Sequence, residues 1–82
     1  MDLVIGNIKI KDINVRNLDN RGWFFILDKD NLSSLSQDDS NLLKQCIRYG
    51  TQVRFVNEIG FSQTKQIYDI ALDDTSIKCY YR

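Results

Sequence analysis

The sequence predicts a mainly β domain, a small barrel of five strands with one short helix between strands. The first observation is that short segments of alternating apolar and polar residues are separated by turn-forming residues, as in half-buried strands. The second is that 82 residues without a proline, a repeat or a linker make a single domain, residues 1–82. Closure of the sheet would leave no exposed strand edges. The alternative is an α+β fold with a β-hairpin, a helix and a three-stranded meander.

The first predicted strand covers residues 4–10, and its inward face consists of Val4, Gly6, Ile8 and Ile10. The alternation then shifts by one position, and the next apolar residues are Ile13 and Val15. One inserted residue near Lys11 and Asp12 would cause this shift, so we expect a β-bulge there. Residues 17–22 are rich in turn formers and lead into a second strand at residues 23–27.

The middle of the chain is predicted to be a loop followed by a helix. Residues 28–40 are polar, which indicates a loop with at most one weak strand at 32–36. Asp39 or Ser40 is expected to cap a helix of about ten residues that ends near Gly50. The apolar face of this helix is predicted to hold Leu42, Leu43, Cys46 and Ile47.

The rest of the chain is predicted to form strands joined by tight turns. One strand begins at Thr51, and the turn at residues 58–60 leads to a second strand over residues 66–72. After a turn at residues 73–75, a last strand covers residues 76–81. Its predicted buried face holds Ile77, Cys79 and Tyr81.

Three adjacent aromatic residues stand in the segment RGWFFI, residues 21–26. Neighbouring side chains of a strand point to opposite faces of the sheet. If Phe24 and Ile26 point into the core, then Trp23 and Phe25 point away from it. Those two rings either form an exposed aromatic surface or pack beneath the apolar face of the helix.

Three segments, in this order, resemble the cold-shock domain, a five-stranded OB-type barrel that binds single-stranded nucleic acid. GNIKIK (6–11) resembles the family's opening strand, GxVKWF, and RGWFFI resembles its first RNA-binding motif, KGFGFI. YGTQVRFVNEIGFSQTKQIYDIAL (49–72) resembles the closing segment, in which a glycine precedes a VxF strand. Phe24 replaces the family's glycine between two stacking rings, and DKDNLSSLS (28–36) lacks the aromatic residues of the second motif.

The resemblance implies that the chain binds single-stranded RNA or DNA through an aromatic and basic strand surface. Unpaired bases stack on exposed rings for ~1–3 kcal/mol each, and nearby cations neutralise phosphates. The expected nucleic-acid-binding residues are Lys9, Lys11, Arg21, Trp23, Phe25 and Arg54. Formal net charge is zero, with 11 basic and 11 acidic residues, whereas binders of duplex DNA usually carry a positive excess.

A second hypothesis gives the exposed rings a protein partner, because Trp, Tyr, Phe and Arg are enriched at interface hot spots. The chain would then be a small regulator or inhibitor, of the type carried by phages or mobile elements, that occupies a host protein. The Tyr80–Arg82 end is either a second aromatic and basic cluster or part of an ordinary final strand.

The residue types do not indicate catalysis, a cofactor or a metal site. The chain has no histidine and no nucleotide-binding or nucleophile motif, so we expect a protein that is not an enzyme. The acidic run 28–39 lacks the glycine and closing glutamate of an EF-hand loop and is expected to be solvated. Cys46 and Cys79 match no zinc spacing and are expected to be reduced thiols.

The expected location is cytoplasmic, without a membrane partner. No apolar stretch reaches the ~18–20 residues that cross a bilayer, and the first residues lack the apolar block of a signal peptide. The sequence does not specify an oligomeric state.

Overall fold

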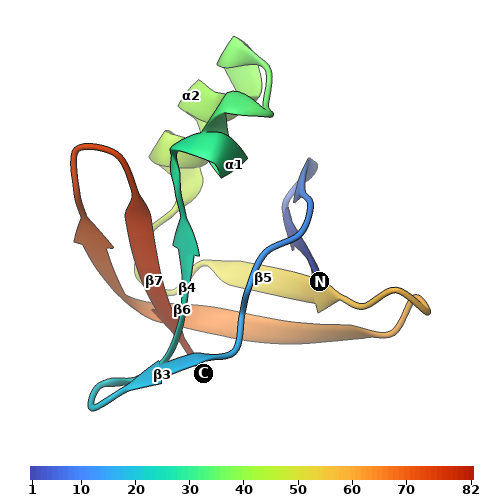
Figure 1. Cartoon of the computed structure of the whole chain (residues 1–82), viewed down its shortest axis with the longest axis vertical. Coiled ribbons are helices and arrows are strands. Elements are labelled where there is room, and N and C mark those ends of the chain that lie inside the picture. The colour runs from blue at the N-terminus through green and yellow to red at the C-terminus, as the bar shows by residue number, and fades with distance from the viewer.

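The computed structural model covers residues 1–82 and forms one antiparallel seven-stranded sheet with two helices at one end (Figure 1). The strands are β1 (Asp2–Ile5), β2 (Ile8–Ile10), β3 (Asn17–Asp19), β4 (Gly22–Leu27), β5 (Gln52–Val56), β6 (Ser62–Leu72) and β7 (Ile77–Tyr81), and the helices are α1 (Lys29–Ser33) and α2 (Gln37–Cys46). Their order in the sheet is β2-β1-β5-β6-β7-β4-β3. The mainly β character is confirmed, but the sheet is not closed, so the predicted five-stranded barrel is wrong.

Strand β6 joins the two halves of the sheet, because its two ends pair with different neighbours. Residues 62–66 pair with β5, and residues 67–72 pair with β7. A register shift between Ile67 and Asp69 leaves Tyr68 as an extra residue, and such bulges bend a strand and increase its twist. The first half therefore contains β2, β1 and β5, and the second half contains β7, β4 and β3.

The two edge strands, β2 and β3, follow one another in the chain, and residues 11–16 run between them (Figure 1). Ile13 and Val15 bury their side chains in the core. The Ile13 N–H donates to the carbonyl of Met1 at 2.7 Å, and the Tyr81 hydroxyl donates to the carbonyl of Val15. Asp12 turns the chain with φ of +59° just after β2 has ended. The expected one-residue shift is present, because the register of β1 and β2 would place Met1 opposite Asp12 but Ile13 bonds to Met1 instead. A packed connection thus takes the place of direct pairing between the edges.

Residues 2–10 form a hairpin, so the prediction of a single strand over residues 4–10 is wrong. Gly6 has φ of +59°, a conformation that a two-residue type II′ turn requires at its first central position. Chain reversal places Leu3 opposite Ile10 and Ile5 opposite Ile8, and all four are buried. Val4 points outward instead, because it pairs with the exposed Lys9.

The predicted loop at residues 28–40 contains α1 and the start of α2. Asp28 caps α1 by accepting from the Asn31 N–H at 2.9 Å, and the Asn31 side chain accepts from the Asp28 N–H at 3.0 Å. Ser36 caps α2 by accepting from the Asp39 N–H at 3.1 Å. Helix α2 therefore begins before the predicted cap at Asp39 or Ser40, and it ends at Cys46 rather than near Gly50.

The core fills the inner face of the bent sheet and is centred on aromatic residues. Phe25 packs edge-on against Phe55 with ring centroids 5.8 Å apart, and Phe55 packs against Tyr81 at 4.8 Å. The prediction that alternate residues of the last strand are buried is confirmed for Ile77, Cys79 and Tyr81. Helix α2 contributes only Leu43 to this core, and Ile47 is buried just after the helix ends. Leu42 and Cys46 of the predicted apolar face are exposed. Neither helix has the length and apolar character that a membrane span requires.

Candidate functional site

Strand β4 places the three adjacent rings of RGWFFI in three different environments. Phe25 is fully buried and pairs with Cys79 of β7, so the interpretation that Phe24 points inward and Phe25 outward is wrong. Phe24 lies on the outer face, opposite Tyr80. Trp23 shares the inner face with Phe25 but remains 47% exposed, because it lies near the end of the strand beside exposed Leu18 of β3.

The other predicted nucleic-acid-binding residues lie in two separate places. Lys9 and Arg54 flank Val4 on the outer face of the first half, and Lys9 is 3.5 Å from the carboxylate of Asp2. Arg21 lies in the β3–β4 turn near Trp23. Strands β6 and β7 lie between β5 and β4, so Arg21 and Trp23 are separated from Lys9 and Arg54.

Lys11 is exposed just beyond β2. The structure therefore does not bring the six residues together, and the buried Phe25 is not available to stack on a base.

A cluster of charged and aromatic side chains covers the outer face of the second half. This polar–aromatic cluster consists of Asp19, Arg21, Phe24, Tyr68, Asp69, Lys78 and Tyr80. At its centre the Tyr80 hydroxyl donates to Asp19 Oδ2 at 2.6 Å, and Lys78 Nζ donates to the same oxygen at 3.1 Å. These bonds tie the β3–β4 hairpin to β7.

The cations of the cluster lie against its rings. Lys78 Nζ is 4.1 Å from the centroid of Phe24, and the Arg21 guanidinium is 4.8 Å from the centroid of Tyr80. Arg21 also forms an ion pair with Asp69, and its carbonyl accepts from the Tyr68 hydroxyl. Tyr80 is only 3% exposed, so its ring is already covered by its neighbours.

The hydrogen bonds of the cluster hold Asp19 and Lys78 in their charged forms. The bond from the Tyr80 hydroxyl, with the Arg21 N–H and Lys78, lowers the pKa of Asp19 to about 2 against an opposing effect of burial. Bonds to Tyr80 and Asp19 raise the pKa of Lys78 above its usual value. Neither Asp19 nor Lys78 therefore titrates near neutral pH.

The turn between β5 and β6 presents two large apolar side chains on an ordered loop. This hairpin tip, residues Asn57–Phe61, lies at one end of the long β5–β6 hairpin (Figure 1). The Asn57 side-chain oxygen accepts from the N–H of Ile59 at 3.1 Å and from that of Phe61 at 2.9 Å. Ile59 is nevertheless 78% exposed and Phe61 72% exposed.

The sequence signal for this tip was the apolar Ile59 inside a predicted turn. Residues 58–60 do lie in the turn, and Gly60 adopts φ of +89°. Turns are usually polar, so an isoleucine and a phenylalanine beside Gly60 indicate an exposed apolar surface. Neither residue was among the predicted site residues.

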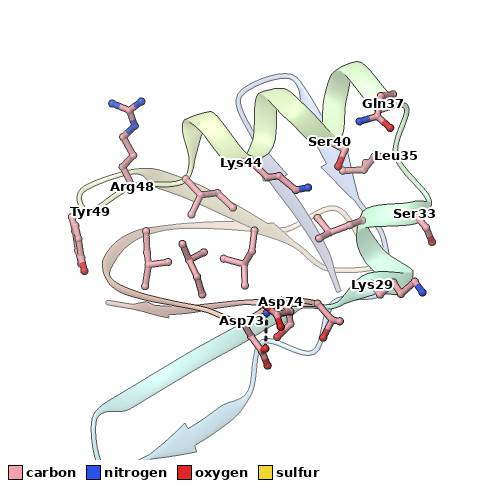
Figure 2. A pocket seen from close by; sticks show the side chains of 17 residues that line it. Lys29, Ser33, Leu35, Gln37, Ser40, Lys44, Arg48, Tyr49, Asp73 and Asp74 are labelled. Atoms are coloured by element: carbon pink, nitrogen blue, oxygen red, sulfur yellow. Dashed lines mark hydrogen bonds between the residues drawn. The ribbon is translucent and has the colours of Figure 1, made fainter.

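A groove of about 1090 Å³ separates the two helices from the β6–β7 turn (Figure 2). Its apolar floor consists of Leu32, Leu35, Ile47, Ile70, Leu72 and Ile77. Lys29, Lys44 and Arg48 lie on the helix side, and Asp73 and Asp74 lie in the opposite turn. The groove thus combines an apolar floor with rims of opposite charge.

The two thiols occupy contrasting positions and form no disulfide. Cys46 is exposed at the end of α2, whereas Cys79 is buried in β7. Burial raises the pKa of the Cys79 thiol to about 12, so this thiol stays protonated and unreactive at neutral pH. No group of three or more His, Cys, Asp or Glu side chains is placed to hold a metal ion.

No protein-family model matches the chain, and comparisons with curated proteins and with solved structures yield no significant match. The resemblance of its motifs to the cold-shock domain is therefore not supported by a family match. The fold and the surfaces described above are the observations from which its function is argued.

Proposed function

We propose that the chain is a non-enzymatic binding protein whose partner is another protein, contacted through the hairpin tip. The observation that carries this proposal is the exposure of Ile59 and Phe61 on a loop that Asn57 already orders. Aromatic and large apolar side chains dominate interface energetics when they enter a pocket of the partner. A loop ordered before binding loses little conformational entropy when the complex forms.

Binding at the tip suits a small regulator that acts by occupying the surface of a target, such as a host protein. The tip lies in a turn that projects beyond the paired residues of β5 and β6, so a partner pocket can reach it without disturbing the core. A cytoplasmic location is part of the proposal, and the two unpaired cysteines fit a reducing compartment.

The test is site-specific photo-crosslinking in the natural host cell. A photoreactive phenylalanine analogue at position 61 is expected to capture one protein in high yield. The matched control places the same group at Asp38, which is exposed on α2 outside the groove. Ile59→Ser is expected to reduce the crosslink from position 61. Equal capture from both positions, or none from position 61, would contradict the proposal.

Binding of single-stranded nucleic acid is the second candidate, favoured by the 47% exposure of Trp23 next to the Arg21 turn. Arg21 would supply the charge next to a base stacked on Trp23, whereas Lys9 and Arg54 lie on the outer face of the other half of the sheet. Trp23 is the only tryptophan, so its fluorescence reports directly on base stacking. Quenching by an oligonucleotide at low salt that disappears at high salt is the expected result. An oligonucleotide titration without quenching at low salt would exclude this candidate.

A further inference from the structure

We infer that the groove binds an amphipathic helix of a partner protein, and that this helix carries acidic side chains along the edge facing α2. The groove contains no residue of the hairpin tip, so the inference holds or fails independently of the contact proposed there. Three properties of the groove identify this occupant: an apolar floor on which Leu72 stays exposed, a volume that fits about two helical turns, and charges on both rims that form no ion pair within this chain.

The apolar floor of the groove is only partly covered, since Ile47 and Ile77 are buried but Leu72 is not. Leu72 lies on the inner face opposite buried Ile77, yet it is 79% exposed. Helix α2 does not fill the space with apolar side chains, because Gln37, Ser40 and Lys44 stand one turn apart on its groove side (Figure 2). An occupant must therefore bring apolar side chains of its own.

The volume of the groove fits a helix. Residues 70–72 pair with β7, and Ile77 pairs with both Leu72 of β6 and Leu27 of β4. On its other side this part of β6 has no strand partner, because β5 pairs only with residues 62–66, and an added strand would have to use that edge. A helix needs only a groove for its side chains. The groove volume of about 1090 Å³ is comparable to about two turns of a helix 10–12 Å in diameter.

The charges on the rims orient the occupant. None of Lys29, Lys44 and Arg48 forms an ion pair within this chain. Lys44 extends from α2 at the mouth of the groove, with Lys29 toward one end and Arg48 toward the other (Figure 2). Carboxylates on the edge of the helix facing α2 would meet Lys44, whereas Lys29 lies on α1 and the Arg48 side chain points away from the groove (Figure 2).

The two aspartates of the opposite rim would repel the same carboxylates. Asp73 and Asp74 lie in the β6–β7 turn, and neither forms an ion pair. Like charges placed across an interface are unfavourable and fix the orientation of a partner. The bound helix is therefore acidic on the α2 side and free of acidic residues on the side of the turn.

Two designed peptides of about 16 residues test this chemistry. Both carry leucines at positions i, i+3, i+4 and i+7, and one edge holds glutamates in the first peptide and lysines in the second. Fluorescence anisotropy at low salt is expected to show at least about tenfold tighter binding of the acidic peptide, the discrimination expected of complementary rim charges. Amide NMR shifts are expected at Leu72 and Lys44 but not at Ile59.

Two substitutions separate the contributions of floor and rim. Leu72→Ser is expected to weaken binding of the acidic peptide about tenfold. The chain should stay folded, because the Leu72 side chain is largely exposed. Lys44→Glu is expected to weaken binding of the acidic peptide and to strengthen binding of the basic peptide. Lys11→Glu, an exposed charge outside the groove, is the control that leaves both affinities unchanged.

Several results would overturn the inference. They are the absence of binding by the acidic peptide, equal affinity for the two peptides, or affinity that Leu72→Ser leaves unchanged. Amide shifts confined to the hairpin tip would also overturn it. Ile59→Ser separates the two proposals, because it is expected to reduce the crosslink from position 61 and to leave peptide binding intact.

Discussion

The polar–aromatic cluster and the hairpin tip are both ordered by side-chain hydrogen bonds, yet they differ in what they leave exposed. In the cluster Tyr80 donates to Asp19, and cations lie over the rings of Phe24 and Tyr80. At the tip Asn57 satisfies two backbone N–H groups, but the side chains of Ile59 and Phe61 contact solvent. Aromatic and basic composition therefore does not by itself indicate an exposed ring, because Tyr80 of the cluster is covered while Ile59 and Phe61 of the tip are not.

The largest effect on stability is expected for Tyr80→Ala in the cluster. The Tyr80 ring is nearly buried and lies 5.5 Å from Phe24 and 6.1 Å from Tyr68, measured between centroids. Its removal is expected to lower the free energy of unfolding by about 3 kcal/mol in chemical denaturation. The control is Tyr49→Ala, since Tyr49 is 67% exposed and should change stability by less than about 0.5 kcal/mol. If the two variants lose equal free energy of unfolding, packing of Tyr80 in the cluster does not stabilise the fold.

A smaller loss is expected for Asn57→Ala at the tip. The N–H groups of Ile59 and Phe61 lose their acceptor, and exposed bonds of this kind contribute about 1 kcal/mol in total. Amide hydrogen exchange is expected to accelerate at both residues, which would show that the tip has lost its order. Glu58→Ala is the control within the same turn. Unchanged exchange rates in Asn57→Ala would show that another group orders the loop.

The acid dependence of stability is expected to come partly from Asp19. Its pKa is about 2 in the folded chain and 3.8 in the reference state, so the unfolded chain binds more protons between these values. The stabilisation is therefore complete above about pH 4 and lost as pH falls toward 2. Denaturation at several pH values is expected to give a flatter profile for Asp19→Asn and, in part, for Tyr80→Phe. A profile that neither substitution changes would contradict this assignment.

The smallest effect on stability is expected for Phe61→Ser. Because the side chain is 72% exposed, the free energy of unfolding should change by less than about 0.5 kcal/mol. Capture of a partner by crosslinking should nevertheless be lost when a neighbouring tip position carries the photoreactive group. A large loss of stability would show that Phe61 packs within the chain and would remove the contrast with Tyr80.

Local patterns predicted the elements best where one face of a strand is buried along its whole length. Strand β7 is the clearest case, since Ile77, Cys79 and Tyr81 are buried as their alternation predicts. The alternation of apolar and polar residues did not predict the hairpin at Gly6. Its two-residue turn lies inside a stretch whose alternation is also typical of one continuous strand. The pattern failed again at Asp28, because this residue and Asn31 form a capping box within a polar stretch that resembles a loop.

The candidate surfaces were harder to predict because exposure depends on residues far away in the sequence. Alternation separated Phe24 from Phe25 correctly, but both faces of β4 carry apolar side chains, so the inward face could not be chosen. Phe25 is buried by Phe55 and Tyr81, which come from strands much later in the chain. The groove likewise brings together residues from α1, α2 and the β6–β7 turn.

The sequence by itself determined the mainly β character, the turn at residues 58–60 and the buried face of the last strand. These features depend on backbone geometry and on neighbours within a few residues. Only the tertiary structure decided which ring of RGWFFI is buried and where apolar side chains remain in solvent. The reason is that burial comes from non-local pairing: the contact between Tyr80 and Asp19, which helps to hold β3 and β4 in place, joins residues 61 positions apart.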